Sequence, residues 1–185
     1  MSTRRHLLGL RRRSLATAGT AALAAAGAAA VLATASAGAA QRAAASNPSC
    51  ATAQLGVKIL NKPNGAAGTI YYPIRFTNKG TRACTVRGYP GVSAVTSTGA
   101  QIGNPATRIN TGTAAKTVTI QPKKSASTMV GFSHTANFPA AKCKPVTARG
   151  LRVIPPNQTT SVTLKHKFSA CSSKSVVFLT VLPIK

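Results

Sequence analysis

The sequence contains no aspartate and no glutamate in 185 residues, whereas it contains 24 lysine and arginine residues. Ordinary proteins carry acidic and basic residues in similar numbers, which together make up about a quarter of the chain. Side-chain carboxylates orient catalytic histidines, protonate leaving groups and bind calcium and magnesium. Their absence excludes most enzyme mechanisms and the usual calcium or magnesium sites, so we expect neither an enzymatic activity nor a cofactor.

Other patterns typical of reactive sites are also missing. The sequence has no Gly-x-Ser-x-Gly and no Ser-x-x-Lys motif. Beyond the first 39 residues the only histidines are His134 and His166, and no carboxylate is present to fix the tautomer of either ring. We therefore interpret both as structural or surface residues. Three tyrosines and five phenylalanines are too few for an aromatic platform that stacks nucleic-acid bases.

The first 39 residues have the features of a secretory signal peptide. Arginines at positions 4, 5 and 11–13 precede an uncharged, alanine-rich stretch over 14–37. Ala35-Ser36-Ala37 and Ala37-Gly38-Ala39 both fit the small-x-small pattern at which signal peptides are cleaved. We therefore expect an exported protein that is secreted, extracellular or associated with the cell envelope.

Two details of this segment stay open. Thr3-Arg4-Arg5-His6-Leu7-Leu8 also fits a twin-arginine motif, although the arginines at 11–13 lie closer to the apolar stretch and favour the general secretory route. The same stretch approaches the roughly 20 residues of a membrane span. An uncleaved anchor is therefore the alternative to a cleaved signal.

The rest of the chain is predicted to be one all-β domain over 50–185, preceded by a flexible leader over 40–49. Apolar residues recur there with period two, and turn residues interrupt the pattern roughly every eight to twelve positions. Strands are expected at 55–59, 71–77, 84–86, 92–95, 117–120, 127–132, 151–154, 162–165 and 176–182. So many short strands in a small exported domain predict a single immunoglobulin-like two-sheet β-sandwich.

Two expectations concern the placing of these strands. Pro73 cannot donate a hydrogen bond to a ladder, so its strand is expected at a sheet edge or at a bulge. If Leu151 pairs with Leu164, then Arg152 lies opposite Thr163 and diagonal to Lys165 on the outward face.

Four cysteines, Cys50, Cys84, Cys143 and Cys171, predict two disulfides. An even number of cysteines in an exported chain, without Cys-x-x-Cys spacing, favours bridges over a zinc site. Three pairings exist. The midpoints of Cys50–Cys84 and Cys143–Cys171 both fall in predicted turns, as expected for bridges across hairpins, and we favour this pairing.

Several segments resemble the family of exported proteins that share domain of unknown function 4232 (DUF4232). They are Tyr72-Pro73-Ile74-Arg75-Phe76-Thr77-Asn78, Cys84-Thr85-Val86-Arg87-Gly88-Tyr89-Pro90-Gly91-Val92, Val118-Thr119-Ile120-Gln121-Pro122 and Cys143-Lys144-Pro145. The resemblance implies an immunoglobulin-like sandwich and an envelope or extracellular location in high-GC Gram-positive bacteria. It brings no known activity and no assigned site residues. Members usually have Pro-Gly where this chain has Pro122-Lys123, and we would expect ordinary acidic residues in such domains.

Basic residues are the candidate contacts for a ligand. Lys123 and Lys124 are expected at a turn. Lys142 and Lys144 flank a cysteine, Lys165 and Lys167 flank a histidine, and each pair would project to one side of an extended chain. The predicted polyanion contacts are Lys123, Lys124, Lys142, Lys144, Arg152, Lys165 and Lys167.

The charge predicts a class of partner. Five of the 24 basic residues lie in the expected signal, which leaves 19 in the mature chain. We expect a secreted cationic module that adheres to polyanions of the cell envelope or extracellular matrix: phosphate-bearing wall polymers, acidic glycans or anionic lipid head groups at a membrane surface. Nucleic acid would bind only non-specifically. The alternative is a structural or protein-interaction module, such as an inhibitor, with an acidic protein partner; the charge can also serve solubility alone.

Overall fold

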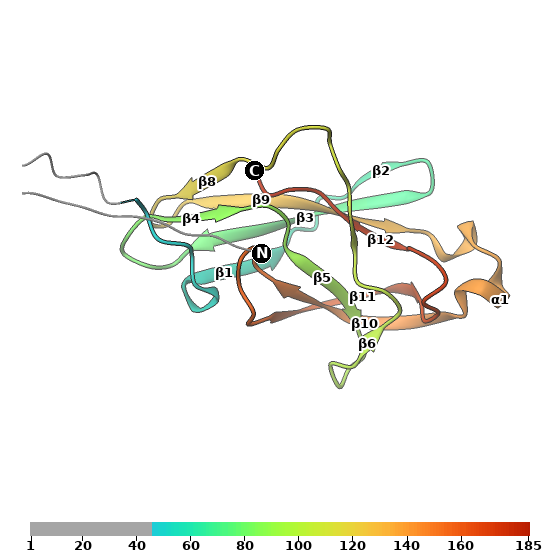
Figure 1. Ribbon diagram of the computed structural model, residues 1–185. Coiled ribbons are helices and arrows are strands. Elements are labelled where there is room, and N and C mark those ends of the chain that lie inside the picture. The colour runs from blue at the N-terminus through green and yellow to red at the C-terminus, as the bar shows by residue number, and fades with distance from the viewer. Residues whose placement is uncertain (1–45) are drawn as a thin grey trace, which may run out of the picture. The chain divides into compact units, whose positions relative to one another are not determined.

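A computed structural model describes residues 46–185, so the expected signal over 1–39 and most of the expected leader lie outside the described residues. The described part consists mainly of strands (Figure 1). They are β1 (Leu55–Ile59), β2 (Asn64–Ala66), β3 (Thr69–Asn78), β4 (Cys84–Arg87), β5 (Gly91–Val95), β6 (Gln101–Ile102), β7 (Thr107–Arg108), β8 (Thr117–Ile120), β9 (Ser125–Ser133), β10 (Pro145–Ile154), β11 (Val162–Cys171) and β12 (Leu179–Val181). Short helical segments are η1 (Thr52–Gln54), η2 (Thr135–Asn137) and α1 (Ala140–Cys143). No helix in this part of the chain has the length and apolar character to cross a bilayer.

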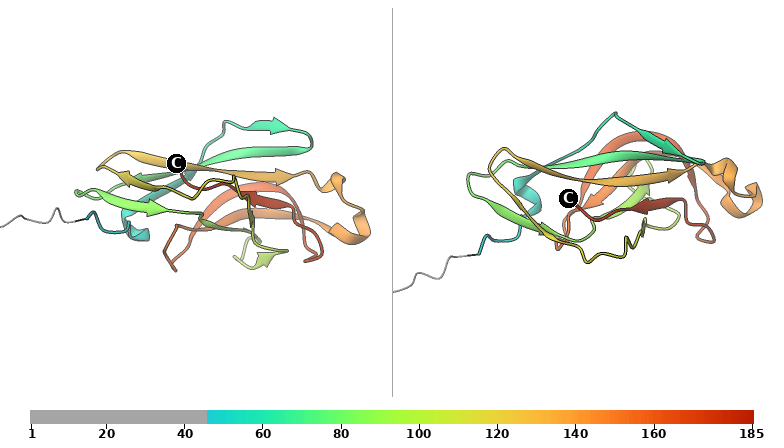
Figure 2. Two further views of the ribbon diagram at one scale, coloured as in Figure 1. Left: turned by 45° about the horizontal axis from the view of Figure 1, so that its top comes forward. Right: turned by 90° about the horizontal axis from the view of Figure 1, so that it is seen from above.

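The strands form a sandwich, which confirms the predicted fold class. One sheet has the order β1-β3-β9-β12-β7, with β2 also paired to β3, and the other has the order β11-β10-β5-β6. A small third sheet consists of β4 and β8. Figure 2 shows the two larger sheets as layers, with the β10–β11 hairpin extending toward α1. β11 is an edge strand of its sheet.

Alternating apolar residues build the core between the layers. Ile74 and Phe76 of β3 are fully buried, and so are Leu151 and Val153 of β10 in the opposite sheet. Each such side chain stabilises the fold by roughly 1.5–3 kcal/mol relative to an exposed one. Lysines and arginines occupy the outward positions between them, as at Lys58, so the hydrophobic pattern keeps the charge on the surface.

The expectation that Pro73 marks an edge strand or a bulge was wrong. β3 lies between β1 and β9, and Pro73 is in regular register with Met129 of β9. The Pro73 carbonyl accepts a hydrogen bond from the Leu60 N–H at 2.8 Å, which places the ring nitrogen on the β1 side of the strand. Because β1 has ended there and β2 has not begun, no ladder bond is lost at the proline.

The predicted register of the β10–β11 hairpin is confirmed, although both strands are longer than the predicted 151–154 and 162–165. Leu151 pairs with Leu164, and Arg152 lies opposite Thr163, as predicted. Beyond this point the register shifts between Ala148 and Gly150, which marks a bulge in the hairpin. The strand expected at 176–182 is shorter and comprises only β12.

Both disulfides have the predicted pairing, Cys50–Cys84 and Cys143–Cys171. The second closes the far end of the β10–β11 hairpin, where Pro145 pairs with Cys171. The first joins the start of the domain to β4, and Pro48 in the expected leader also accepts a hydrogen bond from the Thr85 N–H at 2.8 Å. The two bridges therefore fix the start of the domain to β4 and close the α1 end of the β10–β11 hairpin.

Lys123 adopts a backbone conformation that favours glycine. Its φ is +65°, and the turn is held by the Lys123 N–H donating to the Asn78 carbonyl at 2.9 Å. A left-handed conformation destabilises a residue that has a Cβ by about 1–2 kcal/mol. Glycine avoids this strain, but part of its advantage is offset by its larger conformational entropy in the unfolded chain.

Replacing Lys123 with glycine is therefore expected to stabilise the domain by about 0.5–1 kcal/mol. Urea unfolding of Lys123→Gly and of Lys123→Ala separates the backbone effect from the loss of charge. Alanine removes the charge but keeps the Cβ, so the glycine variant should be the more stable of the two. Equal stability of both variants would show that charge, not backbone strain, governs this turn.

Candidate anion-binding site

The bulge of the β10–β11 hairpin collects cations around one groove. Arg149, Lys165 and Lys167 line a hollow of about 620 Å³, together with His166. The remaining lining residues are Thr96, Ser97, Gly150 and Thr163. The three long basic side chains are exposed, and the sequence has no side-chain acid to neutralise them. The groove therefore attracts anions.

The register shift explains why Arg149 belongs to this groove. Gly150 pairs with Lys165 and Ala148 pairs with Phe168, so one residue of β10 lies opposite two residues of β11. Bulges of this kind bend a strand and redirect its side chains. Gly150 allows the close approach, because a Cβ at this position would lie 2.6 Å from the Leu164 carbonyl oxygen.

His166 lies half-buried at the junction between the groove and an aromatic cluster. Its ring centroid is 4.9 Å from that of Tyr72 and 5.6 Å from that of Phe132. Burial lowers the pKa of His166 from its ordinary value of 6.5, because a buried imidazolium loses hydration. The imidazole is consequently mostly neutral at neutral pH, and the groove gains a further charge only in acid.

The aromatic cluster lines a second, smaller hollow. Phe168 packs edge-to-face on Phe132 with ring centroids 4.8 Å apart. The hollow has a volume of about 240 Å³ and is lined by Tyr72, Phe132, His166 and Phe168 together with hydroxyl side chains of η2 and β11. The Thr135 and Ser169 hydroxyls are 3.0 Å apart and hydrogen-bond to each other. His166 and Lys167 of the edge strand β11 line both hollows, so the two are neighbours along this strand.

The predicted contact residues do not form one site. Lys165 and Lys167 lie in the groove, and Arg152 lies farther along β10, where its guanidinium donates to Gln101 Oε1 at 2.7 Å. Lys123 and Lys124 form the turn before β9, at the opposite end of the domain from α1 (Figure 1).

Lys142 and Lys144 are not in an extended chain, contrary to the prediction. Lys142 belongs to α1, and Lys144 caps this helix in the left-handed conformation with φ +49°. Both side chains are exposed. The Lys144 carbonyl accepts hydrogen bonds from Ser172, which places the pair at the α1 end of the same hairpin that carries the groove.

Sequence reasoning missed Arg149 and interpreted His166 as a structural or surface residue. Arg149 has no basic neighbour in the sequence, and only the bulge brings it to Lys165 and Lys167. The Lys165-His166-Lys167 triplet was the available signal, since its alternation places the histidine inward and the lysines outward.

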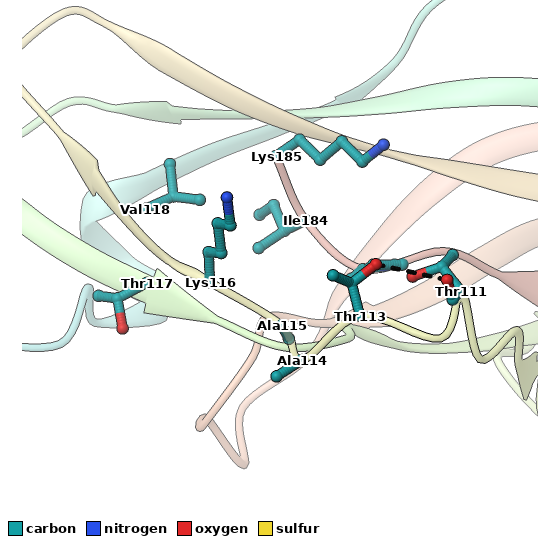
Figure 3. A pocket seen from close by; sticks show the side chains of 10 residues that line it. Thr111, Thr113, Ala114, Ala115, Lys116, Thr117, Val118, Ile184 and Lys185 are labelled. Atoms are coloured by element: carbon teal, nitrogen blue, oxygen red, sulfur yellow. Dashed lines mark hydrogen bonds between the residues drawn. The ribbon is translucent and has the colours of Figure 1, made fainter.

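A further hollow of about 530 Å³ lies between the segment before β8 and the C-terminus (Figure 3). Alanine, threonine and proline side chains contribute most of its lining, and its two cations are Lys116 and Lys185. The backbone of Lys185 is paired with Ser127 by two hydrogen bonds of 2.8 Å. This hollow has two basic side chains, whereas the groove on the β10–β11 hairpin has three.

No cluster of three or more histidine or cysteine side chains suited to a metal ion occurs within residues 46–185. Fold and site together define a disulfide-bonded β-sandwich with a cationic groove beside an aromatic pocket. The family model described as "Domain of unknown function (DUF4232)" matches residues 50–185, and the chain belongs to this family. No curated protein and no solved structure matches the chain.

Proposed function

We propose that this protein is an exported, cationic β-sandwich that adheres to polyanions of the cell envelope or extracellular space. The observation that carries the proposal is the exposure of Arg149, Lys165 and Lys167 around one groove in a chain without side-chain carboxylates. Export is supported by the arginine-rich, alanine-rich first 39 residues and by two disulfides, which persist in oxidising compartments. The resemblance to exported DUF4232 proteins of high-GC Gram-positive bacteria agrees with this location.

Electrostatics favours a polymer over a small anion. Six of the 24 basic residues precede residue 46, which leaves 18 on the described domain. A polyanion carries condensed counterions, and each cation that replaces one of them contributes entropy to binding. The groove would hold one anionic group, while Arg152 on the same hairpin, and Lys142 and Lys144 at its α1 end, would contact neighbouring groups of the polymer.

The mature domain is expected to bind immobilised heparin, with an affinity that falls linearly in a plot of log K against log salt. Replacing Arg149, Lys165 and Lys167 with glutamine should lower the slope by about 2–3, taking the coefficient of about 0.9 per phosphate contact of B-DNA as a guide. The matched control replaces three exposed lysines at the other end of the domain: Lys79, Lys123 and Lys124. Isothermal titration at several salt concentrations measures both slopes.

A protein that passes through a heparin column at about 50 mM salt would contradict polyanion binding altogether. Equal loss in the two triple variants would show that net charge acts without a defined groove. Retention that survives about 500 mM salt would favour the alternative, an acidic protein partner held by shape complementarity, because screening at this ionic strength leaves charge pairs little range.

A further inference from the structure

The hollow beside the cationic groove has a different chemistry from the groove itself. Its lining combines ring faces and edges of Tyr72, Phe132 and Phe168 with the hydroxyls of Ser133, Thr135 and Ser169. Tyr72 and His166 also line a third hollow of about 230 Å³ toward Leu60 and Asn61. His166 therefore lines all three hollows and Tyr72 lines two of them, and only the groove is strongly cationic.

Size limits what the aromatic hollow can hold. Its volume of about 240 Å³ lies below the roughly 300 Å³ at which pockets for drug-sized ligands begin, so it suits a single ring. Rings that pack on aromatic faces while hydroxyl groups hydrogen-bond around their rim are those of sugars. A simple inorganic anion would leave the apolar part of this lining unused.

The neighbouring groove adds the second requirement. His166 and Lys167 line both hollows, and Lys165 and Arg149 follow in the groove. A ligand in the aromatic hollow that extends past the edge strand β11 would therefore place a neighbouring substituent among three cations. Like-charged side chains this close gain stability from an anion between them, because no carboxylate of the chain can take that place.

We propose that the two neighbouring hollows together bind a glycan with an anionic substituent, its sugar ring against Tyr72, His166 and Phe168 and its phosphate, sulfate or carboxylate among Arg149, Lys165 and Lys167. The inference rests on the proposed function and narrows it from polyanions in general to anionic saccharides. Aromatic side chains would then select for the sugar, and basic side chains for the charge.

The test compares two polyanions in Tyr72 variants. A heparin-derived tetrasaccharide has sugar rings, whereas a polyphosphate of equal charge has none. Tyr72→Leu should weaken tetrasaccharide binding about tenfold, since an aromatic contact of this kind contributes up to about the free energy of one decade in affinity. Polyphosphate affinity should change less than twofold.

Tyr71→Leu is the matched control, because Tyr71 precedes Tyr72 on β3 and points to the other face of the sheet, away from the three hollows. It should leave both affinities unchanged. Glucose 6-phosphate and galacturonate, measured against glucose and inorganic phosphate, distinguish a sugar phosphate from a uronate as the preferred anion.

Chemical-shift mapping of the unmodified protein provides a test that does not depend on whether the variants fold. The tetrasaccharide should shift the amide resonances of Ser133, Thr135 and Ser169 as well as those of Lys165 and Lys167. Shifts confined to the lysines, or equal losses for both polyanions in Tyr72→Leu, would overturn the inference and leave the proposed function standing. Absence of binding by either polyanion would overturn both.

Discussion

Reduction of both disulfides is expected to unfold the domain at room temperature. The bridges join residues 34 and 28 positions apart in the sequence. On the chain-entropy model each closed loop of this length contributes roughly 3.5–4 kcal/mol, so the two together reach about 7–8 kcal/mol. A domain of this size has a net stability of about 5–15 kcal/mol, before the repulsion among 18 basic residues is counted.

Alanine pairs at Cys50 with Cys84 and at Cys143 with Cys171 separate the two contributions. Each double variant should lose about 3–4 kcal/mol in denaturant unfolding. All four cysteines are buried, so part of any loss in the free energy of unfolding comes from lost packing. Variants with serine in place of each pair of cysteines provide the second comparison. A fully reduced protein that melts within a few degrees of the oxidised form would show that the core alone holds the sandwich together.

Resistance to acid is the second large expected effect. Acid unfolding ordinarily requires protonation of carboxylates whose pKa values are lowered in the native state, each worth about 2.6 kcal/mol for a shift from 3.9 to 2.0. This chain has no side-chain carboxyl group, so no side-chain carboxylate takes up a proton as the pH falls below about 5. The melting temperature should therefore stay level from about pH 5 to pH 2 at constant ionic strength.

The titration of His166 should add one small decrease in stability at a pH higher than that of this plateau. Burial lowers its pKa in the folded state below the ordinary 6.5, so the unfolded chain takes up a proton first as pH falls. The neutral His166 ring contributes its full stabilisation above pH 6.5. This stabilisation is lost as the pH falls from 6.5 to the pKa of His166 in the folded protein. At still lower pH, His166 causes no further change in the free energy of unfolding.

Circular dichroism melts across pH 8 to 2 measure both effects. His166→Gln should remove the step and keep the plateau. A cooperative loss of the β-sheet signal between pH 4 and 2 in the unmodified protein would contradict the account, since no side-chain group in the sequence titrates there.

Much of the fold could be predicted because period-two patterns and turn residues act locally. β8 has the predicted bounds, and the opposition of Arg152 and Thr163 follows from pairing two apolar positions. β6 and β7 have two residues each, too few for any alternation to be visible. The strand of Pro73 was wrongly predicted to lie at an edge. The proline lies opposite the gap between β1 and β2, and the sequence around Pro73 does not indicate where its partner strands begin and end.

The candidate site was predicted only in part for a similar reason. Lys165 and Lys167 follow from alternation within one strand, whereas Arg149 depends on a register shift between strands. Tyr72, Phe132 and Phe168 come from three different strands, and sequence spacing contains no sign that their rings meet. Lys142 and Lys144 were expected to project to one side of an extended chain, but the single helical turn of α1 rules out this arrangement.

The position of β11 at the edge of its sheet also concerns contacts between copies of the protein. An edge strand exposes unpaired backbone groups that can recruit another strand, and charged side chains along the edge prevent such pairing. β11 is 10 residues long and carries Lys165 and Lys167 in exposed positions. A second copy approaching edge to edge would bring four lysines together without an acidic side chain to neutralise them, so Lys165 and Lys167 also disfavour strand-by-strand association of folded copies.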